Sequence, residues 1–327
     1  MKTLKTLFLC CLPLFMAGCG KSAAADDKGG QPVRFILDYL PNAIHAAFYA
    51  ALDQGFYSEN GLAVSIMAPT STTDTLRLMA SGKAEFGLAP LIDVVKARAD
   101  GEPVVIIAGV VRTPLASVIT TKGSGITRPK DFEGRLIGTS GIPGDEIIIR
   151  SMMINDGADP NKARFINIGY NLIPNLAAGR IDGVIGFWSQ EAIQFASYGE
   201  PVVIRMEDYG FPVFPEIVLF CREEMVREHP ETVRKFLEAN ARGMDWSLSH
   251  EDAALAGLAS HVEGVDAAEL TPFFDALRPV YVGDAPVYGF MNIEGIGTYA
   301  KWAGQMGLLN LGTPVSDFVT NEYLPSR

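Results

Sequence analysis

Polar and aromatic side chains gather in a short loop, DYLPNAIH, at residues 38–45. Asp38 offers a carboxylate acceptor, Tyr39 an aromatic face, and His45 an imidazole that donates or accepts a hydrogen bond. Asn42 is placed to cap the following helix, because an asparagine side-chain oxygen accepts a free backbone N–H at a helix start. The apolar run before the loop has the pattern of a strand, so these side chains lie at a strand's carboxyl end.

Each of these residues also has a purely structural interpretation. Asp38 can accept N–H groups within the turn, Tyr39 can cover a sheet edge, and His45 can be a satisfied surface histidine. On the expected helix, Ile44 belongs to the apolar stripe, whereas His45 and Tyr49, four residues apart, share another face that can look into a cleft. Because the side chains occur together at a strand end before a helix, they indicate a site.

A second group lies in GVIGFWSQEA, where a buried strand pattern gives way to a helix. The Trp188 indole offers a stacking face, or it packs in a core or at a hinge. Glu191 offers an acceptor, or it is a first-turn acid favoured by the helix dipole. In the segment TSTTD, Ser71 and Thr72, together with Thr73, could donate hydroxyl hydrogen bonds, although helix capping explains at least one of them.

The loop SGIPGDE has the glycine spacing of a weak anion-binding motif, with Gly141 and Gly144 before a helix. Asp145 and Glu146 occupy the first turn of that helix, so the positive end of its dipole is already offset. A sulfonate or phosphate is therefore not expected at this position.

Two α/β lobes are expected to position these residues. From Val33 onward, short apolar runs alternate with amphipathic stretches, and the pattern restarts after residues 119–134. One lobe is expected to comprise residues 33–115 and 216–327 and the other residues 116–215, with two hinge crossings near residues 112–118 and 211–219. The ligand cleft is expected between the lobes, because open α/β sheets bind ligands outside the carboxyl ends of their strands.

The N-terminus has the pattern of an export signal. Lys2 and Lys5 precede an apolar stretch that is too short to span a bilayer, and Met-Ala-Gly-Cys at residues 16–19 resembles a bacterial lipobox. We expect residues 1–18 to be a lipoprotein signal peptide, Cys19 to carry the lipid, and residues 19–32 to form a flexible tether. The alternatives are an uncleaved membrane anchor and cleavage without a lipid. The expected location is the extracytoplasmic face of a cell membrane.

Composition excludes several other classes. The 327-residue chain has 38 acidic and 27 basic residues and no basic stripe, so nucleic acid is not an expected partner. Of the four cysteines, Cys221 alone lies beyond residue 19, in the apolar run EIVLFC, where a buried and inert thiol is expected. A disulfide framework and a thiolate metal cluster are thereby excluded. We expect a monomer without metal or cofactor.

The opening DYLPNAIHAAFYAALDQGFYSENGL resembles that of the periplasmic-type solute-binding proteins of the thiamine-pyrimidine group. The likeness continues through TSTTDTLRLMASGKAEFGLA, PGDEIIIRSMMINDGAD, AAGRIDGVIGFWSQEA and REHPETVRKFLEANARGMDWSL, and so covers nearly the whole mature chain. Sulfonate, nitrate and riboflavin binders share the general layout, whereas the Pro-Asn…His opening is specific to a smaller group of proteins. The resemblance implies the two-lobed periplasmic-binding-protein fold of type II.

The resemblance also implies a function. It is that of a lipid-anchored receptor that captures an aminopyrimidine precursor of thiamine and delivers it to an ABC permease and its ATPase. A flat aminopyrimidine fits aromatic faces, for which Tyr39 and Trp188 are candidates, and a carboxylate acceptor, for which Asp38 or Glu191 is a candidate.

Other functions stay open. Riboflavin is the main competing ligand, because a flavin also stacks between aromatic rings, and sulfonates and nitrate follow. An enzyme on the same fold is a further alternative. The eukaryotic pyrimidine synthase resembles this group but needs a cysteine-rich iron motif that this chain lacks, so no enzyme is expected.

Overall fold

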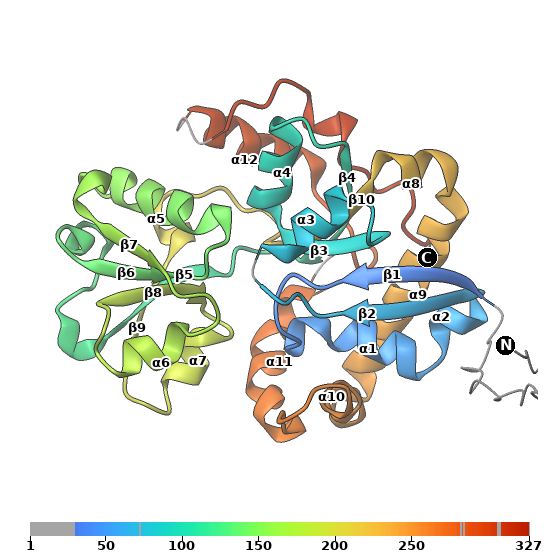
Figure 1. Ribbon diagram of the computed structural model, residues 1–327, viewed down its shortest axis with the longest axis horizontal. Helices are drawn as coiled ribbons and strands as arrows, with labels where there is room; N and C mark the ends of the chain where they lie inside the picture. Colours follow the sequence, from blue (N-terminus) through green and yellow to red (C-terminus); the bar gives the residue numbers. More distant parts are fainter. Residues whose placement is uncertain (1–29, 72, 282, 284, 306–308, 327) are drawn as a thin grey trace, which may run out of the picture.

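The computed structural model consists of two α/β lobes that lie side by side (Figure 1). The expected signal peptide, Cys19, most of the expected tether and Thr72 lie outside the residues that the structure describes. Those described residues are 30–71, 73–281, 283, 285–305 and 309–326.

Lobe 1 is built on a five-stranded sheet of order β2-β1-β3-β10-β4. Strand β1 pairs in parallel with β2 and β3, whereas β10 runs antiparallel to both of its neighbours. The expected tether ends two residues too late, because Gln31 already donates its N–H to the carbonyl of Gly61 at 2.8 Å. The strands of lobe 1 are β1 (Gln31–Ile36), β2 (Leu62–Met67), β3 (Phe86–Pro90), β4 (Val104–Val111) and β10 (Ile217–Arg222).

Helices cover both faces of this sheet (Figure 1). They are α1 (Ala46–Asp53), α2 (Phe56–Glu59), α3 (Asp74–Ala80), α4 (Leu91–Ala99), α8 (Glu223–Glu228), α9 (Pro230–Ser249), α10 (Glu251–Ser260), α11 (Ala267–Tyr281) and α12 (Ile293–Gln305), with the 3-10 turns η1 (Ala43–His45) and η6 (Val315–Asp317).

Lobe 2 repeats the plan with a sheet of order β7-β6-β8-β5-β9, in which β5 runs antiparallel to β8 and β9. Its strands are β5 (Ala116–Thr121), β6 (Leu136–Thr139), β7 (Arg164–Asn167), β8 (Gly183–Phe187) and β9 (Pro201–Arg205). Its helices are α5 (Pro143–Asn155), α6 (Leu172–Ala177) and α7 (Glu191–Phe195), with the turns η2 (Lys122–Ser124), η3 (Pro129–Phe132), η4 (Pro160–Lys162) and η5 (Met206–Tyr209).

Two chain segments join the lobes. The chain leaves the first sheet after Val111 and enters the second at Ala116, then returns between Arg205 and Ile217. The buried carboxylate of Glu216, on the returning segment, accepts the N–H groups of Leu115 at 2.7 Å and of Ala116 at 3.0 Å on the outgoing one. This side chain therefore ties the two crossings together.

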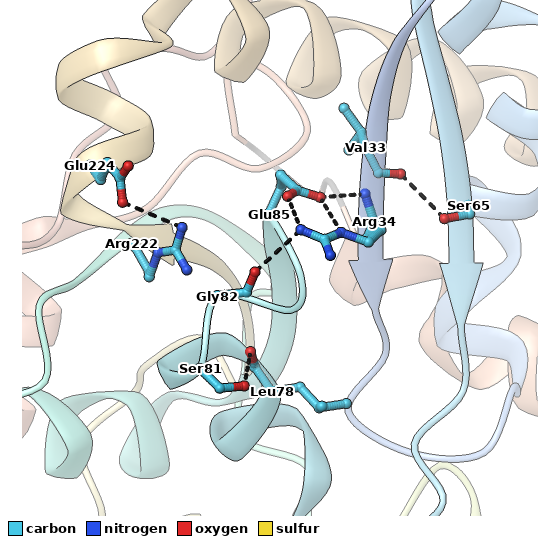
Figure 2. Close-up of polar contacts among 9 residues, drawn as sticks. All are labelled: Val33, Arg34, Ser65, Leu78, Ser81, Gly82, Glu85, Arg222 and Glu224. Atoms are coloured by element: carbon cyan, nitrogen blue, oxygen red, sulfur yellow. Dashed lines mark hydrogen bonds and ion pairs between the residues drawn. The ribbon is translucent and has the colours of Figure 1, made fainter.

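The segment GKAEFG, which leads into β3, makes polar contacts with Arg34 of β1 (Figure 2). Gly82 follows α3 with a φ of +67° that favours glycine, and its carbonyl accepts the Arg34 guanidinium at 3.2 Å. The Glu85 carboxylate accepts the backbone N–H of Arg34 at 2.7 Å and the Arg34 Nε–H at 3.1 Å. These contacts fix the register of β1 against β3.

The core of lobe 1 depends on a close approach of α1 and α9. Phe236 on α9 stacks on Phe86 of β3 with ring centroids 4.1 Å apart. On the same helix, a Cβ at Gly243 would lie 2.2 Å from the carbonyl oxygen of Ala47 on α1. Glycine at this position therefore permits the helices to pack, although it is a poor helix former.

Replacement of this glycine is expected to destabilise the protein. Gly243→Ala should lower the free energy of unfolding by about 1–3 kcal/mol, because the added methyl group overpacks the helix crossing. Urea denaturation measures the change. Gly297→Ala on α12 is the matched control, since a Cβ there meets nothing within 4 Å. It should leave stability unchanged or raise it by up to about 1 kcal/mol, so equal losses in both variants would contradict the packing argument.

Candidate ligand-binding site

A pocket lies between the two lobes, where the parallel strands of both sheets end. Its apolar walls are Ile44, Pro90 and Ile92 from lobe 1 and Ala116, Ile142, Ile148, Leu172, Ile185 and Phe187 from lobe 2. Its acidic residues are Asp38, Asp93, Asp145, Glu191 and Glu216. Among the described residues that line it, none is lysine, arginine or histidine.

Two tyrosines bridge the lobes beside the pocket. Tyr39, which lines the pocket from lobe 1, meets Tyr170 of lobe 2 edge to face, with ring centroids 4.7 Å apart. The Tyr170 hydroxyl donates to the carbonyl of Pro69 in lobe 1 at 3.3 Å. Burial raises the pKa of Tyr39, so its phenol stays neutral. The expected aromatic face of Tyr39 is therefore in place.

The DYLPNAIH loop is held by a network of hydrogen bonds. The Asn42 side chain accepts the N–H of Ile44 at 2.9 Å, as expected for a cap, and its backbone N–H donates to His45 Nδ1 at 3.0 Å. Because Nδ1 accepts, His45 carries its proton on Nε2 and donates it to Asp38 Oδ1 at 2.8 Å. The network fixes the Asp38 carboxylate at the pocket wall.

The structure places His45 outside the pocket, fully buried behind Asp38. Tyr49, expected on the same face, packs against His261 with ring centroids 5.0 Å apart. The expectation that this face looks into the cleft is therefore wrong. The cause is the 3-10 turn at residues 43–45, which precedes α1 and changes the helical periodicity, so that Ile44 lines the pocket instead.

Two pocket acids from lobe 2 occupy helix starts. Glu191, in the first turn of α7, accepts the N–H of Phe187 at 2.7 Å. Asp145, in the first turn of α5, accepts both the N–H and the hydroxyl of Ser140 at 2.7 Å. Burial raises the pKa of Glu191 to about 7 and that of Asp145 to about 6. Acidic side chains in these first turns therefore disfavour an anion at either helix start.

Sequence reasoning missed two further pocket acids. Asp93 follows the end of β3 in the first turn of α4, the same arrangement that pointed to Glu191, so it could have been found. Glu216 precedes β10, and its place at the pocket depends on the antiparallel direction of that strand, which the sequence pattern does not reveal. Burial raises the pKa of Glu216 to about 7 and that of Asp93 well above its usual range.

Trp188 lies at the hinge and not among the residues that line the pocket. Its indole N–H donates to the carbonyl of Pro114 on the outgoing crossing at 3.2 Å, and the Arg205 guanidinium lies 4.5 Å from the ring centroid. The preceding residue, Phe187, lines the pocket instead. Adjacent residues at a strand end point in opposite directions, so the expected aromatic position is displaced by one residue.

The hydroxyl-rich loop is organised by an acid. Ser71 is exposed, and its backbone N–H donates to Asp74 Oδ2 at 2.9 Å. Hydrogen bonds from Thr70 and Arg77 hold the pKa of Asp74 below its usual range. Thr73 lines a neighbouring hollow that shares Asp38 and Asp93 with the main pocket. The structure therefore places Ser71 outside both hollows.

The arrangement suits a small ring-shaped ligand. Carboxyl groups accept or donate hydrogen bonds at the ring edge, and Tyr39 and Phe187 present aromatic surface from opposite lobes. Within the described residues no group of three or more His, Cys, Asp or Glu side chains could hold a metal ion. No helix in the described part of the chain is long and apolar enough to cross a membrane.

The raised carboxyl pKa values predict a pH-dependent stability. A buried acid with a raised pKa binds its proton more tightly in the folded state than in the unfolded state, so the free energy of unfolding should fall as pH rises from about 4.5 to about 7. Chemical denaturation at several pH values measures this slope.

Glu216→Gln is the informative variant for this prediction. It keeps an acceptor for the amides of Leu115 and Ala116 and removes the titration, so its slope over this range should be shallower. The lysine-paired surface residue Glu200 provides the control variant Glu200→Gln. Identical slopes for wild type and Glu216→Gln would contradict the assignment.

Comparison with known proteins agrees with this architecture. A family model described as NMT1/THI5 like matches residues 42–254. The formylaminopyrimidine-binding protein of Halalkalibacterium halodurans is 34% identical over 262 residues, which cover 78% of each chain. A 4-amino-5-hydroxymethyl-2-methylpyrimidine phosphate synthase of Saccharomyces cerevisiae is 29% identical over 229 residues, which cover 66% of this chain and 67% of the synthase.

Solved structures agree at the level of the fold. The periplasmic nitrate-binding protein NrtA of Synechocystis superposes with a TM-score of 0.70 at 13% identity, over 90% of this chain and 87% of that one. Together with the two sheets and the cleft between them, the likeness shows the two-lobed periplasmic-binding-protein fold. On the family match and the 34% identity over most of its length, the chain belongs to the NMT1/THI5-like family.

Proposed function

We propose that this protein is the solute-binding component of an ABC importer, and that it captures an aminopyrimidine precursor of thiamine for delivery to a permease and its ATPase. The observation that carries the proposal is the pocket, in which five carboxyl groups and two aromatic rings face a space that no basic side chain among the described residues lines. The relative named for formylaminopyrimidine binding supports the same ligand class.

An aminopyrimidine matches this pocket in shape and polarity. Its flat ring suits the space between Tyr39 and Phe187, which belong to different lobes and can contact opposite faces. Its exocyclic amine donates to a carboxylate, for which Asp38 and Glu191 stay the candidates. A nitrate or sulfonate would meet carboxyl groups and no basic side chain among the described lining residues, since Asp145 and Glu191 occupy the helix starts.

A binding role is favoured over catalysis. The synthases among the relatives share the family, and the eukaryotic synthase motif implied by sequence resemblance is rich in cysteine. In this chain Cys221 is fully buried in β10, as expected, and burial raises the pKa of its thiol to about 12. This thiol is thus an inert core group. Riboflavin is the competing ligand, because a flavin also stacks on aromatic rings.

We further propose an extracytoplasmic location. The supporting features are the charged and apolar residues 1–18, the lipobox-like residues 16–19, and the small polar residues that follow. In this proposal the mature protein is a monomer that a lipid on Cys19 holds at the membrane surface.

The identity of the amine acceptor is testable by calorimetry. The wild type should bind 4-amino-5-hydroxymethyl-2-methylpyrimidine more tightly than an analogue with hydrogen in place of the exocyclic amine, by about 1.5–3 kcal/mol for a charge-assisted hydrogen bond. One of the two variants Asp38→Asn and Glu191→Gln should remove the acceptor of the amine. That variant should bind the two ligands with nearly equal affinity.

Glu200→Gln, outside the pocket, serves as the control and should retain the full difference. If neither pocket variant reduces the difference in binding free energy between the two ligands, Asp38 and Glu191 do not accept a hydrogen bond from the amine. If the wild type binds riboflavin more tightly than the aminopyrimidine, riboflavin replaces the aminopyrimidine as the proposed ligand.

Lipid attachment is testable in cells of a bacterial host. A labelled fatty acid should enter the wild type and not Cys19→Ser, because the thiol is the attachment point in the proposed anchor. Cys221→Ser is the matched control and should be labelled like the wild type, since its thiol is buried in the folded protein. Equal labelling of wild type and Cys19→Ser would remove the anchor from the proposal.

A further inference from the structure

Asp93 differs from the other pocket acids in how its two oxygens are used. It lies in the first turn of α4 and is only 2% exposed. A first-turn acid commonly supports its own helix through the dipole or a cap. The N-cap of α4 is Pro90, which has no side-chain acceptor, and the carboxyl group of Asp93 accepts its hydrogen bond from lobe 2.

One oxygen of Asp93 joins the two lobes. Oδ1 accepts the backbone N–H of Gly144, at the start of α5 in lobe 2, at 2.9 Å. The contact is close, because a Cβ at Gly144 would lie 2.5 Å from the Ile92 side chain. The junction between α4 and α5 therefore depends on a close approach of the two lobes.

The other oxygen has no partner within the described part of the chain. Oδ2 of Asp93 is buried and makes no hydrogen bond. Asp93 lines both the main pocket and the neighbouring hollow, so its carboxyl group lies where the lobe junction borders the ligand space. A buried oxygen without a partner carries its full desolvation cost, which a hydrogen bond to a ligand would offset.

We propose that Asp93 couples ligand binding to lobe closure, with Oδ1 holding the Gly144 amide and Oδ2 forming a hydrogen bond with the ring edge of the ligand. The inference rests on the proposed function for the identity of that ligand. The aminopyrimidine edge places a ring-nitrogen acceptor beside an amine donor, which matches the hydrogen-bonding range of a carboxyl group.

The environment of Asp93 selects the ring nitrogen as the partner. Burial, followed by the nearby Asp145 carboxyl group, raises the pKa of Asp93 well above its usual range. In the proposed complex the Asp93 carboxyl group donates from Oδ2 to the ring nitrogen, while Oδ1 still accepts from Gly144. Asp38 or Glu191 remains available to accept from the exocyclic amine.

This geometry explains why occupancy favours closure. In the open state the Gly144 amide is released and the ring edge meets Asp93 from one lobe only. Closure completes both hydrogen bonds on one carboxyl group, and the ligand thereby stabilises the state in which the lobes touch.

Two substitutions at Asp93 separate this role from a structural one. Asp93→Asn keeps an oxygen for Gly144 and an N–H donor for the ring, so it should bind 4-amino-5-hydroxymethyl-2-methylpyrimidine within about threefold of the wild type. Asp93→Leu removes both groups and should weaken binding by at least about tenfold. Its melting temperature without ligand should equal or exceed that of the wild type, because a buried, unpartnered oxygen is gone.

Closure is read by small-angle scattering at saturating ligand. The radius of gyration should decrease for wild type and Asp93→Asn but not for Asp93→Leu. Gly144→Ala would place a Cβ 2.5 Å from the Ile92 side chain across the lobe contact and should also oppose closure. Combined with Asp93→Leu it should add little further loss of affinity, because both changes break the same link.

The proposal is overturned if Asp93→Leu binds and closes like the wild type, or if Asp93→Asn loses as much affinity as Asp93→Leu. These outcomes differ from failure of the proposed function, which is absence of aminopyrimidine binding by the wild type. If the wild type binds riboflavin instead, the same comparison of the two Asp93 variants is made with riboflavin, whose ring edge also carries acceptors. If it binds neither, both proposals fail.

Discussion

The desolvation of carboxyl groups in the cleft is the constraint on which the rest of the site depends. Five acids face one pocket, and the described lining contributes no cation to offset them. The fold meets part of this cost with N–H groups: the imidazole of His45 serves Asp38, and main-chain amides serve Asp145, Glu191 and Glu216. The remaining cost appears as raised pKa values, which leave Asp145, Glu191 and Glu216 partly protonated near neutral pH. Such a pocket can both donate and accept without a net charge of minus five.

The same carboxyl groups connect the ligand space to the parts that move. Glu216 lines the pocket and also accepts the N–H groups of Leu115 and Ala116 on the outgoing crossing. A single side chain therefore connects the pocket wall to the hinge. Trp188 adds a second link, because its indole binds the carbonyl of Pro114 and lies under Arg205 at the other crossing. On the far side of the pocket, Tyr39 and Tyr170 touch across the cleft. Hinge and cleft are therefore parts of one polar and aromatic network.

Alternating apolar runs and helix starts were sufficient to predict the two α/β lobes, because each parallel strand and crossover helix has its own local pattern. Asp38 and Glu191 were recognisable for the same reason, and Asp93 obeys that rule too. Prediction failed where the position of a side chain depends on the direction of a strand or on the helical pitch of a turn. Because of the 3-10 turn at residues 43–45, His45 lies behind Asp38 and outside the pocket. At the end of β8, Phe187 lines the pocket, whereas Trp188 lies at the hinge. The place of Glu216 required the strand pairing of β10 with β3, which is a contact between distant segments.

The acids at the helix starts distinguish this pocket from an anion-binding site at helix N-termini. A protein named for nitrate binding shares the fold, and a helix N-terminus is a natural place for an anion because its free N–H groups and dipole favour negative charge. Here Asp145, Glu191 and Asp93 lie in the first turns of α5, α7 and α4, so three helix starts at the cleft already carry carboxyl groups from the chain itself. Burial still raises the pKa of all three acids, and their carboxyl groups line the pocket. The proposed ligand, a neutral nitrogen-rich ring, is compatible with acids one to three residues into each helix, and this placement needs no change in the arrangement of the strands.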